Sequence, residues 1–429
     1  MLPAGSSLSD WLAWLETLSA KEIDLGLERV QAVLDRLSLD RPAHVLLIGG
    51  TNGKGSSVAM IDALLSDAGN RVGAYTSPHV LRYNERIAVA GTAATDDAIV
   101  AAFESVERAR DGLPLTYFEY GTLAAIVVFA ASNLDVWVLE VGLGGRLDAC
   151  NAIEPTASLI TNVSLDHCEW LGNDIETIAS EKAGIMRRDV PAVFGSRDVP
   201  ASLVQHADII GARLILVGRD FDYGVDSDGT WSWKGRSIER RSLPPPGLRG
   251  GFQVGNAAAV LALIEATGLH DALDDGRLNR ILPTVALTGR QQAVRSAGVN
   301  WLLDVAHNPA GAAALAETLA SQRTTGKLWV IAGVLDDKDA SGIACALNGV
   351  VDQWIAVSAS SPRAVPADEL ARQIANACNR PCRISESIAD AIEYARRNAS
   401  DDDTILVTGS FFVVGPALTT LELYSRPQS

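Results

Sequence analysis

The chain has 429 residues, of which 48% are hydrophobic and 21% charged, and it carries a formal net charge of −16 at pH 7. This length and apolar fraction predict a globular protein with large buried cores and two or three domains. A general binder of nucleic acid or of acidic membranes needs a basic face, so the negative charge argues against both partners.

Signals for export or membrane insertion are not found. No apolar run approaches the roughly 20 residues that span a bilayer, and residues 1–18 lack a basic stretch ahead of an apolar one. The sequence contains five cysteines, namely Cys150, Cys168, Cys345, Cys378 and Cys382. Cys378 and Cys382 could suggest a metal pair, but there is no second pair. We therefore expect reduced thiols in a cytoplasmic protein, with a monomer as the default.

The first predicted elements are a buried strand over residues 44–50, a glycine turn, and a helix over residues 56–69. Apolar residues recur on one face of this helix, namely Val58, Ile61, Leu65 and Ala68. Gly69 is placed to end the helix, and residues 71–77 resume as a strand. The order strand, glycine loop, helix, strand is the setting that a phosphate-binding loop requires.

The alternation continues with a helix over residues 123–133 and apolar strands over residues 135–142 and 156–164. Near-continuous apolar strands between helices indicate a parallel sheet covered on both faces. Residues 219–255 are rich in turns with alternating aromatics, which predicts an antiparallel excursion, and residues 256–268 return to helix.

A domain boundary is predicted after "LTGRQQ", which divides the chain into residues 1–292 and 293–429. A second alternating series follows, with strands expected over residues 299–308, 327–334, 352–360 and 404–410. The predicted fold class is α/β, with a P-loop-type, mostly parallel sheet domain followed by a smaller Rossmann-like domain.

The glycine loop reads "GGTNGKGS" and departs from the usual Walker pattern. That pattern requires glycine at the position of Ile48 and a hydroxyl residue directly after the lysine, where this chain has Gly55. Its glycines nevertheless let the backbone approach phosphate oxygens at a helix N-terminus, and Lys54 adds a mobile positive charge. Ser56 or Ser57 can offer a hydroxyl to phosphate-bound magnesium. The alternative is a plain glycine-rich turn.

Polar residues follow other predicted strands. Glu140 ends an apolar strand, where an acid is costly unless it is paired or binds a metal. Ser77 follows a neighbouring strand, and Asp166 and His167 are expected to be exposed at the tip of a third. Serine, glutamate and histidine at one sheet edge would form an unusual magnesium site. A capped carboxylate and an ordinary satisfied histidine are the alternatives.

Three further features are less specific. The "GLGG" motif does not fit a dinucleotide fingerprint, because Leu147 occupies the position of the third glycine. Lys182 alone would be read as a solvated helix lysine. In the second domain, Asp304, His307 and Asn308 lie at a strand-to-helix turn, which is the ligand edge of an α/β sheet.

Ten motifs in this order support a family assignment: "GTNGKGS", "TSPH", "RYNERI", "YFEYGTLAA", "LEVGLGGRLDACN", "SLDH…WLG", "EKAGI", "LTGRQQ", "DVAHNP" and "TGSFF". Together they resemble the folylpolyglutamate synthase/dihydrofolate synthase family of the Mur ligase superfamily over nearly the whole chain. The resemblance implies ATP-driven amide bond formation, in which a carboxylate is phosphorylated and the amine of L-glutamate displaces the phosphate. The implied acceptors are dihydropteroate and tetrahydrofolate polyglutamates.

The resemblance also implies roles for individual residues. The triphosphate would be held by Thr51, Asn52, Gly53, Lys54, Gly55 and Ser56. Magnesium, with two ions expected, would be bound by Ser77, Glu140 and His167. Nucleotide contacts would come from Asn256, Arg290 and Asp304, and the pterin-binding regions would be Leu115, Thr116, Tyr117 and Phe118 with Arg146, Leu147 and Asp148. Lys182 matches a lysine that is carbamylated in the family, and His307 matches a position near the reacting centre. Lys54, Lys182, His167 and His307 are therefore the expected catalytic residues.

Residues 10–30 fit members that bind dihydropteroate, so a bifunctional enzyme is favoured over one with folylpolyglutamate synthase activity alone. A Mur-type ligase acting on a peptidoglycan precursor would need an additional N-terminal domain, for which the residues before the loop leave no room. A kinase or nucleotide switch would need a hydroxyl residue at the position of Gly55. A pure binding module would give Lys54, Glu140 and His167 no reason to converge.

Overall fold

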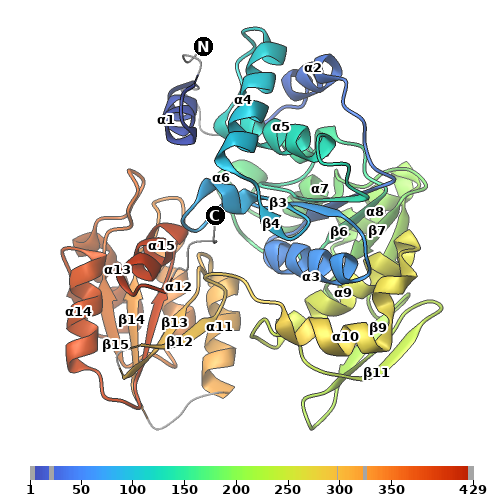
Figure 1. Ribbon diagram of the computed structural model, residues 1–429. Coiled ribbons are helices and arrows are strands. Elements are labelled where there is room, and N and C mark those ends of the chain that lie inside the picture. Colours follow the sequence, from blue (N-terminus) through green and yellow to red (C-terminus); the bar gives the residue numbers. More distant parts are fainter. Residues whose placement is uncertain (1–4, 19–23, 297, 322–325, 424–429) are drawn as a thin grey trace. The chain divides into compact units, whose positions relative to one another are not determined.

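The computed structural model describes residues 5–18, 24–296, 298–321 and 326–423 (Figure 1). The chain packs into two compact units. The first comprises Met1–Ser164, Asn173–Gly247 and Val254–Val285, and the second comprises Leu165–Gly172, Leu248–Gln253 and Ala286–Ser429. Two short early segments thus belong to the second unit, and the predicted boundary after residue 292 stays a prediction. Residues 19–23, inside the segment that fits dihydropteroate-binding members, lie outside the described residues.

An eight-stranded sheet forms the centre of the first unit, with the order β4-β3-β2-β5-β1-β6-β7-β8. Its strands are β1 (His44–Gly49), β2 (Val72–Tyr75), β3 (Ile87–Val89), β4 (Thr92–Ala93), β5 (Val136–Glu140), β6 (Ala157–Ile160), β7 (Pro191–Phe194) and β8 (Arg213–Leu216). The strands from β2 to β8 in this order are parallel, and β3 and β4 form an antiparallel edge. The predicted parallel sheet is confirmed, whereas the antiparallel edge, β7 and β8 were not predicted.

Helices surround this sheet (Figure 1). They are α1 (Leu8–Leu18), α2 (Glu28–Leu37), α3 (Lys54–Asp67), α4 (Asp96–Arg110), α5 (Tyr117–Ala130), α7 (Ile175–Ala183), α8 (Ala201–Ile210), α9 (Phe252–Thr267) and α10 (Asp275–Ile281). Helix α3 buries more than the predicted face, because Met60 and Leu64 are also fully buried. Helix α5 packs against α4 and places Tyr120 and Phe129 in the core.

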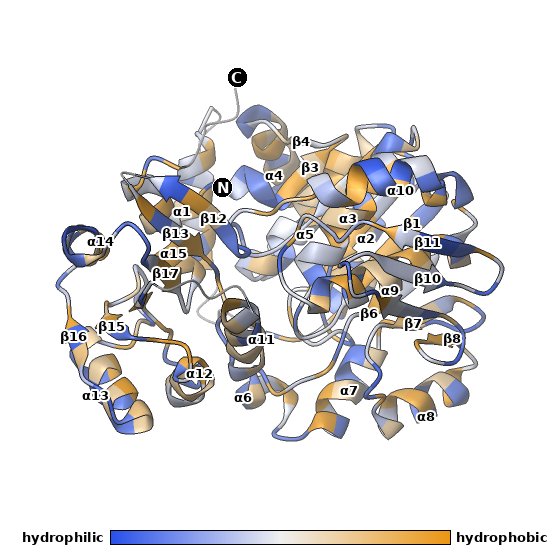
Figure 2. Cartoon of the chain, turned by 90° about the horizontal axis from the view of Figure 1, so that it is seen from below, coloured by the Kyte–Doolittle hydropathy of each residue, from blue (hydrophilic) through white to orange (hydrophobic). Residues whose placement is uncertain are grey.

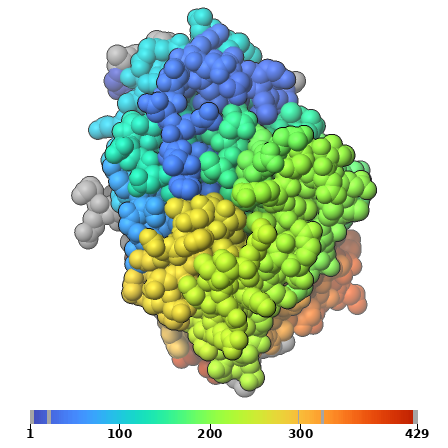
Figure 3. Space-filling model, turned by 90° about the vertical axis from the view of Figure 1, so that its right-hand side faces the viewer, coloured from blue at the N-terminus to red at the C-terminus, as the bar shows by residue number. Residues whose placement is uncertain are grey.

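The turn-rich region forms the predicted antiparallel excursion, a sheet of β9 (Asp222–Val225), β10 (Trp231–Lys234) and β11 (Glu239–Leu243). Trp231 and Trp233 of β10 are fully buried. Arg240 of β11 forms an ion pair with Asp275 of α10, and the two regions lie side by side on one surface of the unit (Figure 3).

The second unit contains a six-stranded sheet with the order β12-β13-β17-β14-β15-β16. Its strands are β12 (Gln292–Ser296), β13 (Val299–Leu303), β14 (Leu328–Ala332), β15 (Gln353–Ala356), β16 (Cys382–Ile384) and β17 (Thr404–Thr408), and all are parallel except β12. Its helices are α6 (Cys168–Leu171), α11 (Pro309–Ser321), α12 (Ala340–Leu347), α13 (Ala367–Cys378), α14 (Ile388–Asn398) and α15 (Phe411–Thr420). Figure 2 shows hydrophilic residues on α14. The opposite face of this helix is apolar and buried, with Ile388, Ala391, Ile392 and Ala395. Among the described residues, no helix combines the length and apolar character needed to span a membrane.

Candidate active site

The loop between β1 and α3 has a backbone that only glycine adopts easily. Gly50 and Gly53 have φ values of 134° and 85°, in the left-handed region. A Cβ atom on Gly50 would lie 1.9 Å from Oγ1 of Thr161, and one on Gly53 would lie 2.8 Å from the side-chain amide of Asn256. The loop therefore lies directly against two neighbouring segments, and the predicted nucleotide residue Asn256 is next to it.

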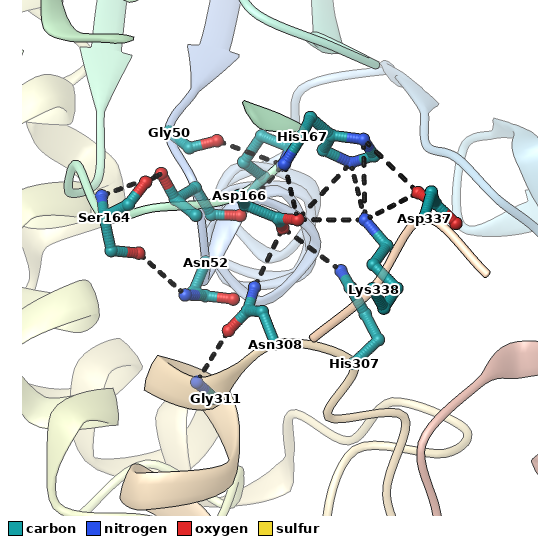
Figure 4. Close-up of polar contacts among 12 residues, drawn as sticks. Gly50, Asn52, Ser164, Asp166, His167, His307, Asn308, Gly311, Asp337 and Lys338 are labelled. Carbon is teal, nitrogen blue, oxygen red and sulfur yellow. Dashed lines mark hydrogen bonds and ion pairs between the residues drawn. The ribbon is translucent and has the colours of Figure 1, made fainter. Parts of the chain in front are cut away.

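Neutral hydrogen bonds from the residues after β6 hold this loop in place. Oγ1 of Thr51 accepts from the backbone N–H of Ser164 at 3.0 Å and donates to its carbonyl at 3.2 Å. The hydroxyl of Thr161 and the amide of Asn162 both donate to the carbonyl of Asn52, at 2.6 and 2.9 Å. Figure 4 shows the contact between Asn52 and Ser164. These neutral hydrogen bonds join the loop to the segment that follows β6.

The first turn of α3 begins at Lys54 and presents its backbone N–H groups toward the loop, which is a favourable site for an anion. The Nζ atom of Lys54 donates to the carbonyls of Gly50 and Thr51, at 3.1 and 3.2 Å. Ser57 is fully buried and its hydroxyl donates to the carbonyl of Gly53 at 3.0 Å. A role of Ser56 or Ser57 toward phosphate-bound magnesium stays a prediction.

Two of the three predicted metal ligands lie together at the carboxyl ends of β2 and β5. Glu140 is 4% exposed, and its Oε2 atom accepts from the backbone N–H of Ser77 at 3.3 Å. A Cβ atom on Gly55 would lie only 3.6 Å from the same oxygen. A carboxylate and a hydroxyl are the hard oxygen ligands that magnesium prefers, so this pair fits the ion.

His167, the third predicted ligand, belongs to the second unit. Among the described residues, no group of three or more His, Cys, Asp or Glu side chains is arranged to hold a metal. The predicted ligands are Ser77, Glu140 and His167. Only two of them are of these residue types, so they could not form such a group. The metal set stays a prediction.

Lys182 is buried in the last turn of α7, with 4% of its surface exposed. The reading of a solvated lysine is therefore wrong. A Cβ atom on Gly145 would lie 2.8 Å from the carbonyl of Glu181 and 3.0 Å from that of Lys182. The "GLGG" loop thus packs on the end of α7, and Arg146 of this loop forms an ion pair with Glu181 at 2.8 Å.

The first predicted pterin region starts α5. Leu115 is buried, and Thr116 caps the helix in a reciprocal capping box with Glu119. The Tyr117 ring lies 5.5 Å from the guanidinium of Arg86. Phe118 packs against the loop that leads to the second region, because a Cβ atom on Gly142 would lie 2.5 Å from its ring. Asp148 of the second region is joined to the same loop, since it accepts from the backbone N–H of Leu143 at 2.9 Å.

Asp148 in the second region is buried and organises its own loop. It accepts from the backbone N–H groups of Leu143 and Cys150, both at 2.9 Å. Burial raises the pKa of Asp148 to about 6, against the opposing effect of these hydrogen bonds. In the same loop, Arg146 is exposed and Leu147 is half-buried.

In the second unit, the predicted nucleotide residues lie near β13 and α15. Asp304 is buried and accepts from the backbone N–H groups of Gln291 at 2.8 Å and Ala306 at 2.7 Å; burial raises its pKa. The guanidinium of Arg290 lies over the ring of Phe411 at 5.3 Å, and the ring of His307 lies 6.3 Å from the same phenylalanine. Phe411 was not predicted as a site residue, although its "TGSFF" motif carried part of the resemblance.

Asp166 is the centre of a charged cluster in the second unit (Figure 4). The expectation that Asp166 and His167 are exposed is wrong, since Asp166 is 9% exposed and the His167 side chain 30%. Asp166 accepts from Nζ of Lys338 and from Nδ2 of Asn308, both at 2.9 Å, and lies 3.5 Å from Nε2 of His307. These partners explain why Asp166 can be buried, because hydrogen bonds and opposite charges compensate for the loss of its hydration.

This cluster changes the pKa values of its members. Burial alone would raise the pKa of Asp166, but His307, His167 and Lys338 outweigh it and hold that pKa well below its usual range. Burial lowers the pKa of His167 to about 4, with Asp166 acting in the opposite direction. Sequence reasoning missed Lys338 and Asp337, which are 3.3 Å apart. The charged run "LDDKD" directly after the strand at residues 327–334 was the available signal.

Two family models match the chain: the Mur ligase middle domain over residues 48–264 and the Mur ligase, glutamate ligase domain over residues 289–411. The fold and these matches define the class of the Mur ligases. A dihydrofolate synthase/folylpolyglutamate synthase of Escherichia coli (strain K12) is 39% identical over 98% of this chain and 96% of its own length. The chain belongs to the dihydrofolate synthase/folylpolyglutamate synthase family, which confirms the resemblance.

Solved structures agree. E. coli FolC in complex with DHPP and ADP matches with a TM-score of 0.92 at 37% identity, covering 99% of each chain. A bifunctional folylpolyglutamate synthase/dihydrofolate synthase with Mn, AMPPNP and L-glutamate bound matches with a TM-score of 0.89 at 36% identity, covering 98% of this chain and 99% of the other. The predicted fold class, a mostly parallel sheet domain with a C-terminal α/β domain, is thereby confirmed.

Proposed function

We propose that this protein is an ATP-dependent ligase that joins L-glutamate to dihydropteroate, forming dihydrofolate, and to folylpolyglutamates. The observation that carries this proposal is the family membership over nearly the full chain. The phosphate loop supports it, because its glycine conformations and helix N-terminus suit a triphosphate.

The residues of the first unit have complementary tasks in this reaction. Lys54 and the N–H groups at the start of α3 neutralise charge on the phosphoryl group that moves to the substrate carboxylate. Magnesium, which Ser77 and Glu140 would hold with His167, supplies further charge neutralisation when bound. The amine of L-glutamate then attacks the acyl phosphate, an amide bond forms, and phosphate leaves with the electrons of the broken C–O bond. In the second unit, Arg290, Asp304 and His307 are proposed to act on the nucleotide and near the reacting carbonyl.

The pterin is proposed to bind where Leu115–Phe118 meets Arg146–Asp148. The packing of Phe118 on Gly142 supports a shared site, since the neighbouring Leu143 is hydrogen-bonded to Asp148. The exposed guanidinium of Arg146 is available to a ligand on the side not occupied by Glu181. The monomeric state and the length of the glutamate chain stay predictions.

Carbamylation of Lys182 is part of the proposal. In this modification the neutral amine adds to carbon dioxide with loss of one proton and gives an anionic carbamate. Burial of Lys182 supports this chemistry. Lys182→Ala should lose most ligase activity and regain part of it with added short-chain carboxylates. Full activity of Lys182→Ala without any addition would contradict a carbamate.

The function is tested by phosphate release from ATP with each substrate added separately. We expect release only when L-glutamate and a pterin acid are both present, and we expect it with dihydropteroate as well as with tetrahydrofolate. Release without glutamate would indicate a kinase or switch and overturn the proposal. Activity with tetrahydrofolate alone would reduce it to a folylpolyglutamate synthase.

A further inference from the structure

His167 has a backbone conformation that its neighbours must stabilise. Its φ and ψ are 50° and 41°, the left-handed region, at the residue that precedes α6. A residue with a side chain adopts this conformation only at an energetic cost. The backbone N–H of His167 donates to Oδ1 of Asp166 at 2.9 Å, so the carboxylate of Asp166 holds this conformation directly.

Asp166 is itself held by an amide whose orientation is determined. Asn308 is 2% exposed, and its Oδ1 atom accepts from the backbone N–H of Gly311 at 2.7 Å, at the start of α11. The other end of the amide, Nδ2, must therefore face Asp166, to which it donates at 2.9 Å (Figure 4). Gly311, Asn308, Asp166 and His167 form one continuous series of hydrogen bonds.

Lys338 contributes positive charge to this series and lies close to the imidazole of His167. Its Nζ atom lies 3.4 Å from Nδ1 and 3.2 Å from Nε2 of His167. The lone-pair directions of the two ring nitrogens diverge, so an ammonium nearly equidistant from both cannot lie along either one. Each ring nitrogen also lies 3.9 Å from a carboxylate oxygen, Nε2 from Asp166 and Nδ1 from Asp337.

We propose that Asn308 is a positioning residue, which fixes the imidazole of His167 for metal binding by holding Asp166. This inference rests on the proposed function, in which His167 is a metal ligand. Groups that orient a metal ligand typically change metal affinity by 10–100-fold when they are removed. A neutral amide is the informative member of the series, because its removal changes geometry without changing charge.

Two substitutions separate position from charge. In Asn308→Ser the hydroxyl can still cap α11 but is too short to reach Asp166. In Asn308→Asp the cap is also kept, the donor is lost, and a negative charge is added. The added negative charge by itself would strengthen the binding of a cation. Loss of the hydrogen bond that positions Asp166 and His167 would weaken it. Ser387→Ala is the matched control, since Ser387 caps α14 of the same unit through the N–H of Asp390 at 3.1 Å.

The measurement is Mn²⁺ binding to the full chain with saturating AMPPNP, followed by the electron paramagnetic resonance signal of free Mn²⁺. We expect about 10-fold weaker Mn²⁺ binding in both Asn308 variants, and no change in Ser387→Ala. Unchanged Mn²⁺ affinity in Asn308→Ser, or tighter binding in Asn308→Asp, would overturn the inference. If one variant does not fold, the other decides alone. The binding assay contains neither a pterin acid nor L-glutamate, so it does not depend on ligase activity. A failure of ligase activity would therefore contradict the proposed function without changing the Mn²⁺ binding result.

Discussion

The two units hold their strand-end residues by different physical means. In the first unit, neutral hydrogen bonds from residues 161–164 hold the loop after β1, and Nζ of Lys54 donates to the carbonyls of Gly50 and Thr51. In the second unit, Asp166 is fixed by an ammonium, an amide and imidazole groups. The difference follows from what each region must do. A loop that is proposed to receive an anion needs positive charge near its backbone N–H groups, whereas a buried acid must have its charge neutralised.

The largest effect on activity is expected from substitution of Lys54. Replacing it by alanine removes the positive charge that is proposed to stabilise the transferred phosphoryl group, so ATP-dependent product formation should fall at least 10²- to 10³-fold, roughly the cost of one preorganised charge-stabilising group. Urea unfolding of the variant separates loss of activity from loss of the fold. Lys234→Ala, at an exposed position on β10, serves as the control. Full turnover of Lys54→Ala would refute the assignment of the loop.

The first unit also contains a histidine beside a cation, and its pKa predicts how stability depends on pH. Nε of Arg86 donates to Nδ1 of His79 at 2.8 Å, and burial, assisted by Arg86, lowers the pKa of His79 to about 4. The unfolded chain, with a pKa of about 6.5, binds more protons between these values, so stability is lost as the pH falls from about 6.5 toward 4.

His79→Gln should remove part of this acid sensitivity, up to about 3 kcal/mol in the difference between pH 7.5 and pH 4.5. Glutamine can still accept from Arg86 but does not titrate in this range. Urea unfolding at the two pH values measures the effect. An equal loss of stability in the variant and in the natural chain would show that His79 is not responsible.

The smallest expected effect tests the neutral contacts themselves. Thr51→Val keeps the shape of the side chain but removes both hydrogen bonds to Ser164, which should cost about 1–2 kcal/mol in unfolding free energy. We also expect a several-fold higher KM for ATP, because the loop is less well fixed. Thr318→Val, which removes one hydroxyl contact inside α11, is the control. Indistinguishable stability and KM in Thr51→Val would mean that the loop does not depend on this contact.

Local pattern was sufficient for much of the first unit. The glycine loop, the strand ends at Glu140 and Ser77 and the parallel sheet were all predicted from spacing and apolar runs. These features depend on backbone conformation and on residues close in sequence, so the pattern contains them. The proximity of Ser77 to Glu140 follows from the rule that parallel strands end at one edge.

Burial of charged residues was where sequence reasoning failed. Asp166 and Lys182 were expected at the surface, and Lys338 was not considered. The partner of Asp166 is 172 residues away in the chain, and no periodic pattern links two such positions. Whether a charge is buried depends on which distant groups pack around it.

The amino-acid sequence by itself determined the family, the α/β alternation and the chemistry of the phosphate loop, because these reside in short motifs and in the period of apolar residues. Only the tertiary structure decided that Asp166 belongs with Asn308 and Lys338, that Lys182 is buried, and that Ser57 faces a carbonyl. Those outcomes come from packing between segments far apart in the chain, where the free energy of burying a charge is set by partners that local sequence does not specify.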